Sequence, residues 1–150
     1  MSLTIKNLSS NKVSTVWAED GFIFKRQPKY LTDNEVHAMG KMLNTGYVPE
    51  FERLGIELIR MKFIEDVRMD IADGESIVEQ ANDILLKMKI RKLRHGDLTR
   101  PNIRWNGDKL YIIDWGESRI RRDPRPDKRP EGDDYWLERT IYQELGLSLK

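Results

Sequence analysis

The stretch HGDLTRPN at residues 95–102, followed by IIDWG at residues 112–116, decides the fold of this 150-residue chain. It sets Asp97, Asn102 and Asp114 on loops beside a short predicted hairpin. Phosphoryl transfer needs such a set: one carboxylate accepts the proton of an attacking hydroxyl, and an amide oxygen and a second carboxylate offer hard ligands to Mg²⁺. The alternative interpretation is a pair of polar turns that cap helices and hairpins.

Upstream of this stretch, the first 65 residues predict a small antiparallel sheet with one helix. Asp20-Gly21 lies between two apolar runs, and this dipeptide is typical of tight hairpins. The expected strands of this half are residues 2–6, 13–18, 22–26, 51–54 and 56–64. The helix is predicted to begin with a capping box at Thr32 and Glu35 and to run to about Asn44.

The second half predicts helices with a small hairpin between them. Apolar side chains recur at helical spacing over residues 75–89, and a last helix is expected over residues 133–145. Residues 103–105 and 110–113 read as two short strands joined at Asn106-Gly107, another tight-turn signal. Residues 117–132 are rich in Arg, Pro and Asp and read as a loop.

This order of elements predicts an α+β fold in two lobes rather than a repeating βαβ chain. We expect one domain over residues 1–150, with an N-lobe over about 1–65 and a C-lobe over about 66–150. The N-lobe holds the small antiparallel sheet and its helix, and the C-lobe is helical and short.

Composition excludes several classes of protein. The chain has no cysteine and only two histidines, which removes disulfide frameworks, cysteine-ligated zinc and multi-histidine metal clusters. Its net charge of +1 gives no global field for nucleic-acid binding. No apolar run approaches a membrane span and the N-terminus has no signal-peptide stretch, so we expect a cytoplasmic protein without membrane contact.

The two quoted stretches resemble the catalytic loop and metal-binding triplet of the protein-kinase-like superfamily. Within it, the sequence is most similar to the KEOPS-complex kinase/ATPase family and to the RIO kinases, where the loop also reads H-G-D-L-T. Thr99 stands where ordinary protein kinases have Lys. The resemblance implies a minimal bilobal kinase-like fold that binds ATP and Mg²⁺. It makes Asp97 the base, Asn102 and Asp114 the metal ligands, and His95 a structural support of the loop.

Two further segments carry this resemblance. Residues 133–139 (DDYWLER) resemble a KEOPS-kinase helix, which makes Asp133 the aspartate that braces the catalytic loop from below. The run MKFIE at residues 61–65 looks like the hinge of the same family. Met61 is then the gatekeeper, and the backbones of Lys62 and Ile64 are expected to bond the adenine edge.

Lys25 and Glu35 match the lysine that holds the nucleotide phosphates and its helix glutamate. The alternatives are a solvent-facing strand lysine, with Lys29 as a rival, and a glutamate that only completes the capping box. The N-terminal half is also similar, more thinly, to aminoglycoside phosphotransferases, through Ser10 to Val16, Lys25, Glu35, and Gly46 to Pro49.

The nucleotide-covering loop departs from the kinase pattern because NLSSNKVS, residues 7–14, has no glycine. Ser9 and Ser10 hydroxyls are the candidate phosphate donors there. Residues Arg119 to Arg129 include six basic side chains, which fit RNA or an acidic protein partner. The alternative is a solvated loop whose charge is offset by Asp123 and Asp127.

These features predict a Mg-ATP-dependent phosphotransferase, either an atypical Ser/Thr protein kinase or an ATPase of the KEOPS/RIO type. A small-molecule phosphotransferase ranks lower, because few residues follow Gly116 to build an acceptor pocket. A nucleotide-binding pseudokinase or scaffold module is the third possibility, favoured by the glycine-free loop. The short C-lobe makes a protein partner or protein substrate more plausible than a self-sufficient enzyme.

Overall fold

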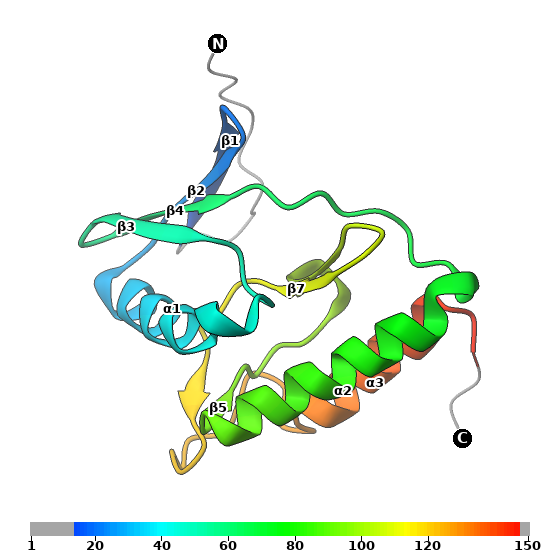
Figure 1. Ribbon diagram of the computed structural model, residues 1–150. Coiled ribbons are helices and arrows are strands. Elements are labelled where there is room, and N and C mark those ends of the chain that lie inside the picture. Colours follow the sequence, from blue (N-terminus) through cyan, green and yellow to red (C-terminus); the bar gives the residue numbers. More distant parts are fainter. Residues whose placement is uncertain (1–13, 148–150) are drawn as a thin grey trace.

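The computed structural model describes residues 14–147, which form an α+β fold in two lobes (Figure 1). The N-lobe is a four-stranded antiparallel sheet in the order β1-β2-β4-β3, with helix α1 beside it. Its elements are β1 (Thr15–Glu19), β2 (Phe22–Arg26), α1 (Lys29–Met42), a 3-10 turn (Leu43–Thr45), β3 (Phe51–Gly55) and β4 (Leu58–Lys62).

The first hairpin turns where the sequence predicts it. Asp20 and Gly21 both have positive φ, 50° and 81°. Two consecutive residues of this kind match the right-handed twist of the flanking strands. The turn sets the register Lys25↔Val16, which sends the Lys25 side chain to the face that meets the C-lobe.

Helix α1 begins three residues before the predicted capping box. Pro28 is its N-cap residue, and Thr32 lies inside the first turns. The Thr32 hydroxyl donates to the carbonyl oxygens of Gln27 and Pro28, at 3.2 and 3.1 Å, rather than capping an N–H group. The predicted capping box is therefore wrong, because Thr32 lies inside the helix and its hydroxyl bonds to the carbonyl four residues before it.

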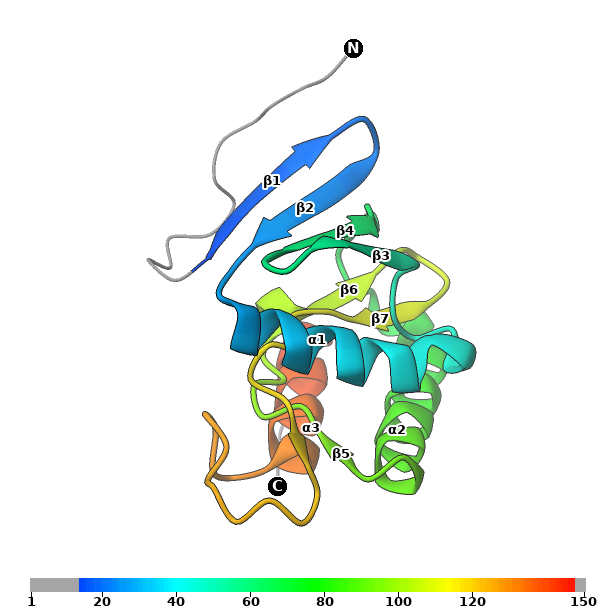
Figure 2. The same cartoon turned by 90° about the vertical axis from the view of Figure 1, so that its left-hand side faces the viewer.

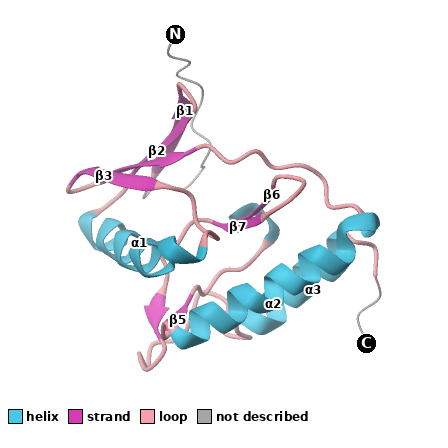
Figure 3. Ribbon diagram, in the orientation of Figure 1, coloured by secondary structure: helices cyan, strands magenta, loops and turns pink. Residues whose placement is uncertain are grey.

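The C-lobe packs two helices below a small hairpin (Figure 3). Helices α2 and α3 lie side by side, and β6 and β7 form the hairpin above them (Figures 1 and 2). The elements are a 3-10 turn (Ile71–Asp73), α2 (Gly74–Ile90), β5 (Leu93–Arg94), a second 3-10 turn (Arg100–Asn102), β6 (Ile103–Trp105), β7 (Leu110–Ile112), β8 (Arg119–Ile120) and α3 (Asp133–Glu144).

The predicted loop over residues 117–132 contains a strand that the sequence did not indicate. Arg119 and Ile120 form β8, which pairs antiparallel with β5 through Leu93↔Ile120. A strand of two residues has no periodicity to detect, so only its distant partner defines it. The strand expected over residues 2–6 lies outside the described residues.

One apolar cluster joins α1 to the C-lobe. Met39 and Met42 of α1 pack in the same cluster as Ile84 of α2, Ile103 of β6 and Ile141 of α3. The hairpin between β6 and β7 therefore sits on a rigid base, which fixes the loops at its two ends. No helix within residues 14–147 combines the length and the apolar character needed to cross a bilayer.

Truncating a core residue of α2 should weaken the fold far more than truncating an exposed one. Ile84 is 0% exposed and Leu86 is 52% exposed. Ile84→Ala should lower the free energy of unfolding by about 2–5 kcal/mol, through lost burial and a cavity. Leu86→Ala should change it by about 0.5 kcal/mol or less. Urea unfolding of both variants checks this, and equal losses would contradict the assigned core.

Candidate active site

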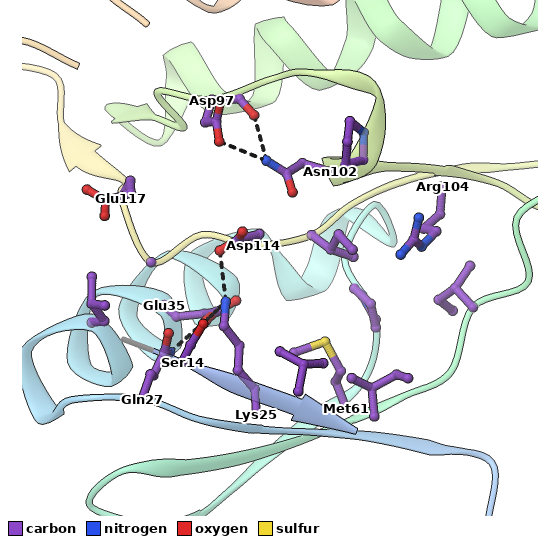
Figure 4. Close-up of a pocket in the computed structure, with 18 of the residues that line it drawn as sticks. Ser14, Lys25, Gln27, Glu35, Met61, Asp97, Asn102, Arg104, Asp114 and Glu117 are labelled. Atoms are coloured by element: carbon purple, nitrogen blue, oxygen red, sulfur yellow. Dashed lines mark hydrogen bonds and ion pairs between the residues drawn. The ribbon is translucent and has the colours of Figure 1, made fainter. Parts of the chain in front are cut away.

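Lys25 stands on the sheet wall of a cleft between the lobes (Figure 4). Its ammonium nitrogen lies 3.0 Å from Oε1 of Glu35 and 2.8 Å from Oδ1 of Asp114. Lys25 belongs to β2, Glu35 to α1, and Asp114 follows β7, so three distant parts of the chain meet at one point. The ion pair between Lys25 and Glu35 expected from the sequence is present.

The Glu35 carboxylate is fully buried and fully engaged. Its Oε1 also accepts a hydrogen bond of 2.8 Å from Nε2 of Gln27, and its Oε2 accepts one of 3.1 Å from the backbone N–H of Trp115. A buried charge is tolerated when it is paired and hydrogen-bonded in this way. Gln27 was not identified from the sequence as a partner of Glu35. Gln27 lies two residues after Lys25, and strand alternation, which places residues two apart on one face, is the signal that would have indicated it.

The charges of this cluster support one another. Burial alone would lower the pKa of Lys25, but the carboxylates of Glu35 and Asp114 outweigh it and raise that pKa above its usual value. Burial alone would raise the pKa of Asp114, but the Lys25 ammonium outweighs it and lowers that pKa. Both Lys25 and Asp114 are therefore charged at neutral pH.

Asp97 and Asn102 face the cleft from the opposite wall (Figure 4). The Asn102 amide nitrogen donates to the Asp97 backbone oxygen at 2.8 Å and to its Oδ2 at 3.2 Å. The loop between them folds into a tight turn, because the N–H of Thr99 bonds to the Asp97 carbonyl at 2.9 Å. These bonds orient the Asn102 amide, so its oxygen is available to the cleft.

The hairpin between β6 and β7 brings Asp114 beside Asn102. Ile103 pairs with Ile112, and the N–H of Ile113 donates to the Asn102 carbonyl at 2.9 Å. Asp114 itself has a φ of 59°, a conformation that costs about 1–3 kcal/mol for a residue other than glycine. Such strain persists only where the surroundings enforce it, here through the bond from Trp115 N–H to Glu35.

His95 and Asp133, which the sequence assigned to structural support of the site, contact the loop at residues 95–102 away from the cleft. The two carboxylate oxygens of Asp133 accept the N–H groups of His95 and Gly96, each at 2.9 Å. His95 Nε2 lies 2.9 Å from the Ile113 carbonyl, and its ring meets the Trp115 indole edge to face at 4.7 Å. Both residues therefore support the site and do not line it.

The cleft has a volume of about 460 Å³ and contains the predicted hinge. Met61, Lys62 and Ile64 line it, together with Lys25 and Asp97 on its two walls. The Lys62 N–H already donates to the Glu50 carbonyl at 2.9 Å, which leaves the Lys62 carbonyl as that residue's candidate for a ligand. Ser9 and Ser10 lie outside the described residues.

Three of the five basic residues of the segment between β8 and α3 form ion pairs. Arg125 pairs with Asp123 at 2.6 Å, as the solvated-loop interpretation expects. Lys128 and Arg129 instead reach Asp97, at 3.3 and 2.9 Å. No local sequence pattern predicts this contact, because it joins residues about 30 positions apart. RNA binding by this segment stays a prediction.

Comparison with known families matches the RIO domain over residues 8–129. The chain belongs to the RIO family. The match includes both quoted stretches and the lysine strand, and it confirms the resemblance to atypical protein kinases. No curated protein sequence matches this RIO chain.

Among solved structures, the PK-1 kinase of Cydia pomonella granulovirus is similar to the RIO chain, with a TM-score of 0.73 and 16% sequence identity. The likeness covers 95% of this chain and 70% of the viral kinase. At this identity it supports the fold alone, and the kinase-like fold predicted from the sequence is confirmed.

Asn102 and Asp114 are the residues of this RIO domain that could hold a divalent cation. Within residues 14–147, no cluster of three or more His, Cys, Asp or Glu side chains could hold a metal ion. An amide oxygen and one carboxylate still fit Mg²⁺, which usually takes one or two carboxylates and completes its shell with water and substrate phosphates. The donor set therefore fits a cation that arrives together with a phosphate ligand.

Removing the Asp133 carboxylate should destabilise the RIO domain. Asp133→Ala leaves the N–H groups of His95 and Gly96 without their acceptors, which should cost about 2–4 kcal/mol of unfolding free energy. The neighbouring Asp134 is exposed and contributes only to the first turn of α3, so Asp134→Ala should cost about 0.3–1 kcal/mol. Thermal and urea unfolding compare them, and a tolerant Asp133→Ala would refute the bracing role.

The contribution of Asp114 to stability should disappear in acid. Because its pKa is lowered in the folded chain, Asp114 stabilises the fold above its ordinary pKa of 3.8, and this is lost as the pH falls through the folded value. The difference in unfolding free energy between wild type and Asp114→Asn should thus shrink between neutral pH and about pH 3. Urea unfolding at both pH values measures it. A constant difference would contradict the link to Lys25.

Proposed function

We propose that this chain binds Mg-ATP in the cleft and transfers the γ-phosphoryl group to a hydroxyl oxygen. One observation carries the proposal: Asp97, Asn102 and Asp114 line a single cleft opposite a lysine that is held by a buried glutamate. Phosphoryl transfer is catalysed mainly by positioning and electrostatics, and this set supplies both.

The proposed reaction assigns one task to each side chain. The acceptor oxygen attacks the γ-phosphorus, the bond to the β,γ-bridging oxygen breaks, and ADP leaves. Asp97 orients the acceptor hydroxyl and takes its proton. Lys25, fixed between Glu35 and Asp114, bonds the non-transferred phosphates. Asn102 and Asp114 would hold Mg²⁺, which neutralises charge on the phosphate oxygens when it is bound.

The hinge residues support adenine recognition. The Lys62 carbonyl offers an acceptor, and within residues 14–147 the Ile64 N–H has no backbone acceptor and so remains a donor. A neighbouring donor and acceptor match the edge of adenine. The Met61 side chain is 6% exposed and lines the inner end of the cleft, where an apolar side chain suits a purine ring.

The acceptor is proposed to be a Ser or Thr hydroxyl of a protein, with water as the acceptor if the chain acts as an ATPase of the KEOPS type. The RIO family match favours these two acceptors over an aminoglycoside-like small molecule. Within the described residues, α3 follows the segment after β8 directly, with no further helix between them.

Substitution of Asp97 should separate chemistry from binding. Asp97→Asn keeps the shape of the side chain but removes the proton acceptor, so the turnover number should fall about 10²–10⁴-fold while Mg-ATP still binds. Asp114→Asn should weaken Mg-ATP binding itself, because a cation ligand is lost. Radiolabelled ATP, incubated with the purified chain alone and with Ser/Thr-containing proteins, reports hydrolysis, autophosphorylation and transfer together.

Asp108→Asn is the matched control, since Asp108 is an exposed aspartate in the turn between β6 and β7. It should leave binding and turnover unchanged. Ligand at about 100 times its Kd should stabilise the fold by roughly 2.7 kcal/mol, a clear rise in melting temperature. If saturating Mg-ATP gives the wild type no such rise, the proposed nucleotide site is wrong.

A further inference from the structure

The segment that follows β8, residues 121–132 and here called the return segment, brings two cations back to Asp97. The Lys128 ammonium lies 3.3 Å from Asp97 Oδ2, and Arg129 Nε lies 2.9 Å from Oδ1. Figure 2 shows this segment as the orange loop that leads into α3. Both carboxylate oxygens of the proposed base therefore have a positive partner from outside the catalytic loop.

Contacts on both sides of Lys128 hold the return segment in place. Before it, the Asp127 side chain is only 7% exposed and lies 3.7 Å from Arg94 Nε. After it, the backbone N–H of Arg129 donates to the Gly96 carbonyl at 2.9 Å, and the Arg129 guanidinium lies 5.0 Å from the centre of the Trp136 ring. The backbone at Lys128 is thus fixed beside the cleft.

Gly96 allows this close approach. Its φ is 90°, and a Cβ at this position would meet the Glu117 carbonyl oxygen at 3.3 Å and the Asp127 Cβ at 3.4 Å. A side chain at residue 96 would therefore be strained and would press on the return segment. The return segment can therefore place Lys128 beside the cleft only because residue 96 is a glycine.

Two other cations that line the cleft have tasks or partners away from the γ-phosphate: Lys25 is proposed to bond the phosphates that remain in ADP, and Arg104 lies 3.6 Å from Asp66. Lys25 is shared between Glu35 and Asp114. Arg100, the one arginine or lysine of the HGDLTRPN stretch, is turned away and pairs with Asp66 at 2.9 Å. Lys128 lines the same cleft as Asp97 and Asp114, and its side chain is 55% exposed.

We propose that Lys128 is a phosphate-binding residue that moves from Asp97 to the γ-phosphate of bound ATP. This inference rests on the proposed function. Arg129 is less exposed, at 40%, and is anchored by its backbone, so it stays on Asp97. Lys128 has one ion pair to give up, and because its side chain is 55% exposed its ammonium can turn to another anion in the cleft while Arg129 stays on Asp97. The γ-phosphate carries up to two negative charges and offers stronger, charge-assisted bonds.

Position also makes this cation selective for the triphosphate. Asp97 is proposed to contact the acceptor hydroxyl, so a side chain that touches Asp97 lies at the transferred phosphoryl group. Lys25, at the opposite wall, is proposed to bond the phosphates that remain in ADP. Loss of Lys128 should therefore weaken the binding of ATP and of the transition state, and hardly change the binding of ADP.

The experiment compares wild type with Lys128→Ala and Lys128→Arg, and uses Arg122→Ala as the control. Arg122 is an exposed cation of the same segment. The measurements are Kd for Mg-ATP and for Mg-ADP, the turnover number and the melting temperature. Lys128→Ala should lower the turnover number about 10- to 100-fold and weaken Mg-ATP. It should leave Mg-ADP affinity and melting temperature unchanged, and Lys128→Arg should restore most of the loss.

Each outcome decides the assignment. Faster turnover in Lys128→Ala would mean that Lys128 blocks Asp97, and unchanged turnover would mean a surface contact; both overturn the proposal while the proposed function stands. The wild type could bind Mg-ATP without turning it over. In that case, a Lys128→Ala variant that loses affinity for Mg-ATP but not for Mg-ADP supports the assignment of Lys128, and an equal loss for both nucleotides overturns it. A wild type that does not bind Mg-ATP overturns the proposed function and this inference with it.

Discussion

The buried carboxylate of Glu35 is the constraint on which the site depends. It is fully removed from solvent, and its two oxygens accept bonds from Lys25, Gln27 and the backbone of Trp115. An unpaired charge at this depth would cost several kcal/mol, so the folded state is favoured only when all three partners are in place. The sheet, α1 and the IIDWG stretch must therefore assemble together.

The contacts of Trp115 and its neighbours extend this bonded network into the C-lobe. The bond to Glu35 holds the residue that follows Asp114, whose backbone is in the left-handed region. His95 then bonds the Ile113 carbonyl and contacts the Trp115 ring, and Asp133 holds His95 from α3. Glu35, His95 and Asp133 each bond at least one backbone group of another segment. This gives the cleft two walls whose spacing is set by packing, as a site that works by positioning requires.

The sequence predicted the parts of this arrangement that local rules determine. Asp20-Gly21 predicted a tight turn, and the apolar spacing of residues 75–89 predicted a helix. The two motif stretches predicted residues that line one wall of the cleft. The sequence-based prediction failed where contacts with residues far along the chain determine the structure. Thr32 matched a capping box, yet Pro28 starts α1 and Glu35 is held by Lys25 and Trp115. No local pattern could place Lys128 and Arg129 on Asp97, since long-range packing alone brings them there.

The hairpin between the two motif stretches explains how Asn102 and Asp114, the proposed cation ligands, come to lie near each other. Asn102 and Asp114 stand at the open ends of one hairpin, and the pairing Ile103↔Ile112 sets them side by side. The turn at Asn106 closes that hairpin, because its Oδ1 accepts the N–H groups of Asp108 and Lys109 at 2.9 and 2.7 Å. The positions of these two proposed ligands thus depend on the register of β6 and β7 and not on the number of residues between them. A slip of one residue would turn every side chain of the hairpin to its other face, and the buried Ile103 and Ile112 exclude it. The apolar core of the hairpin therefore fixes the spacing of the two polar side chains at its end.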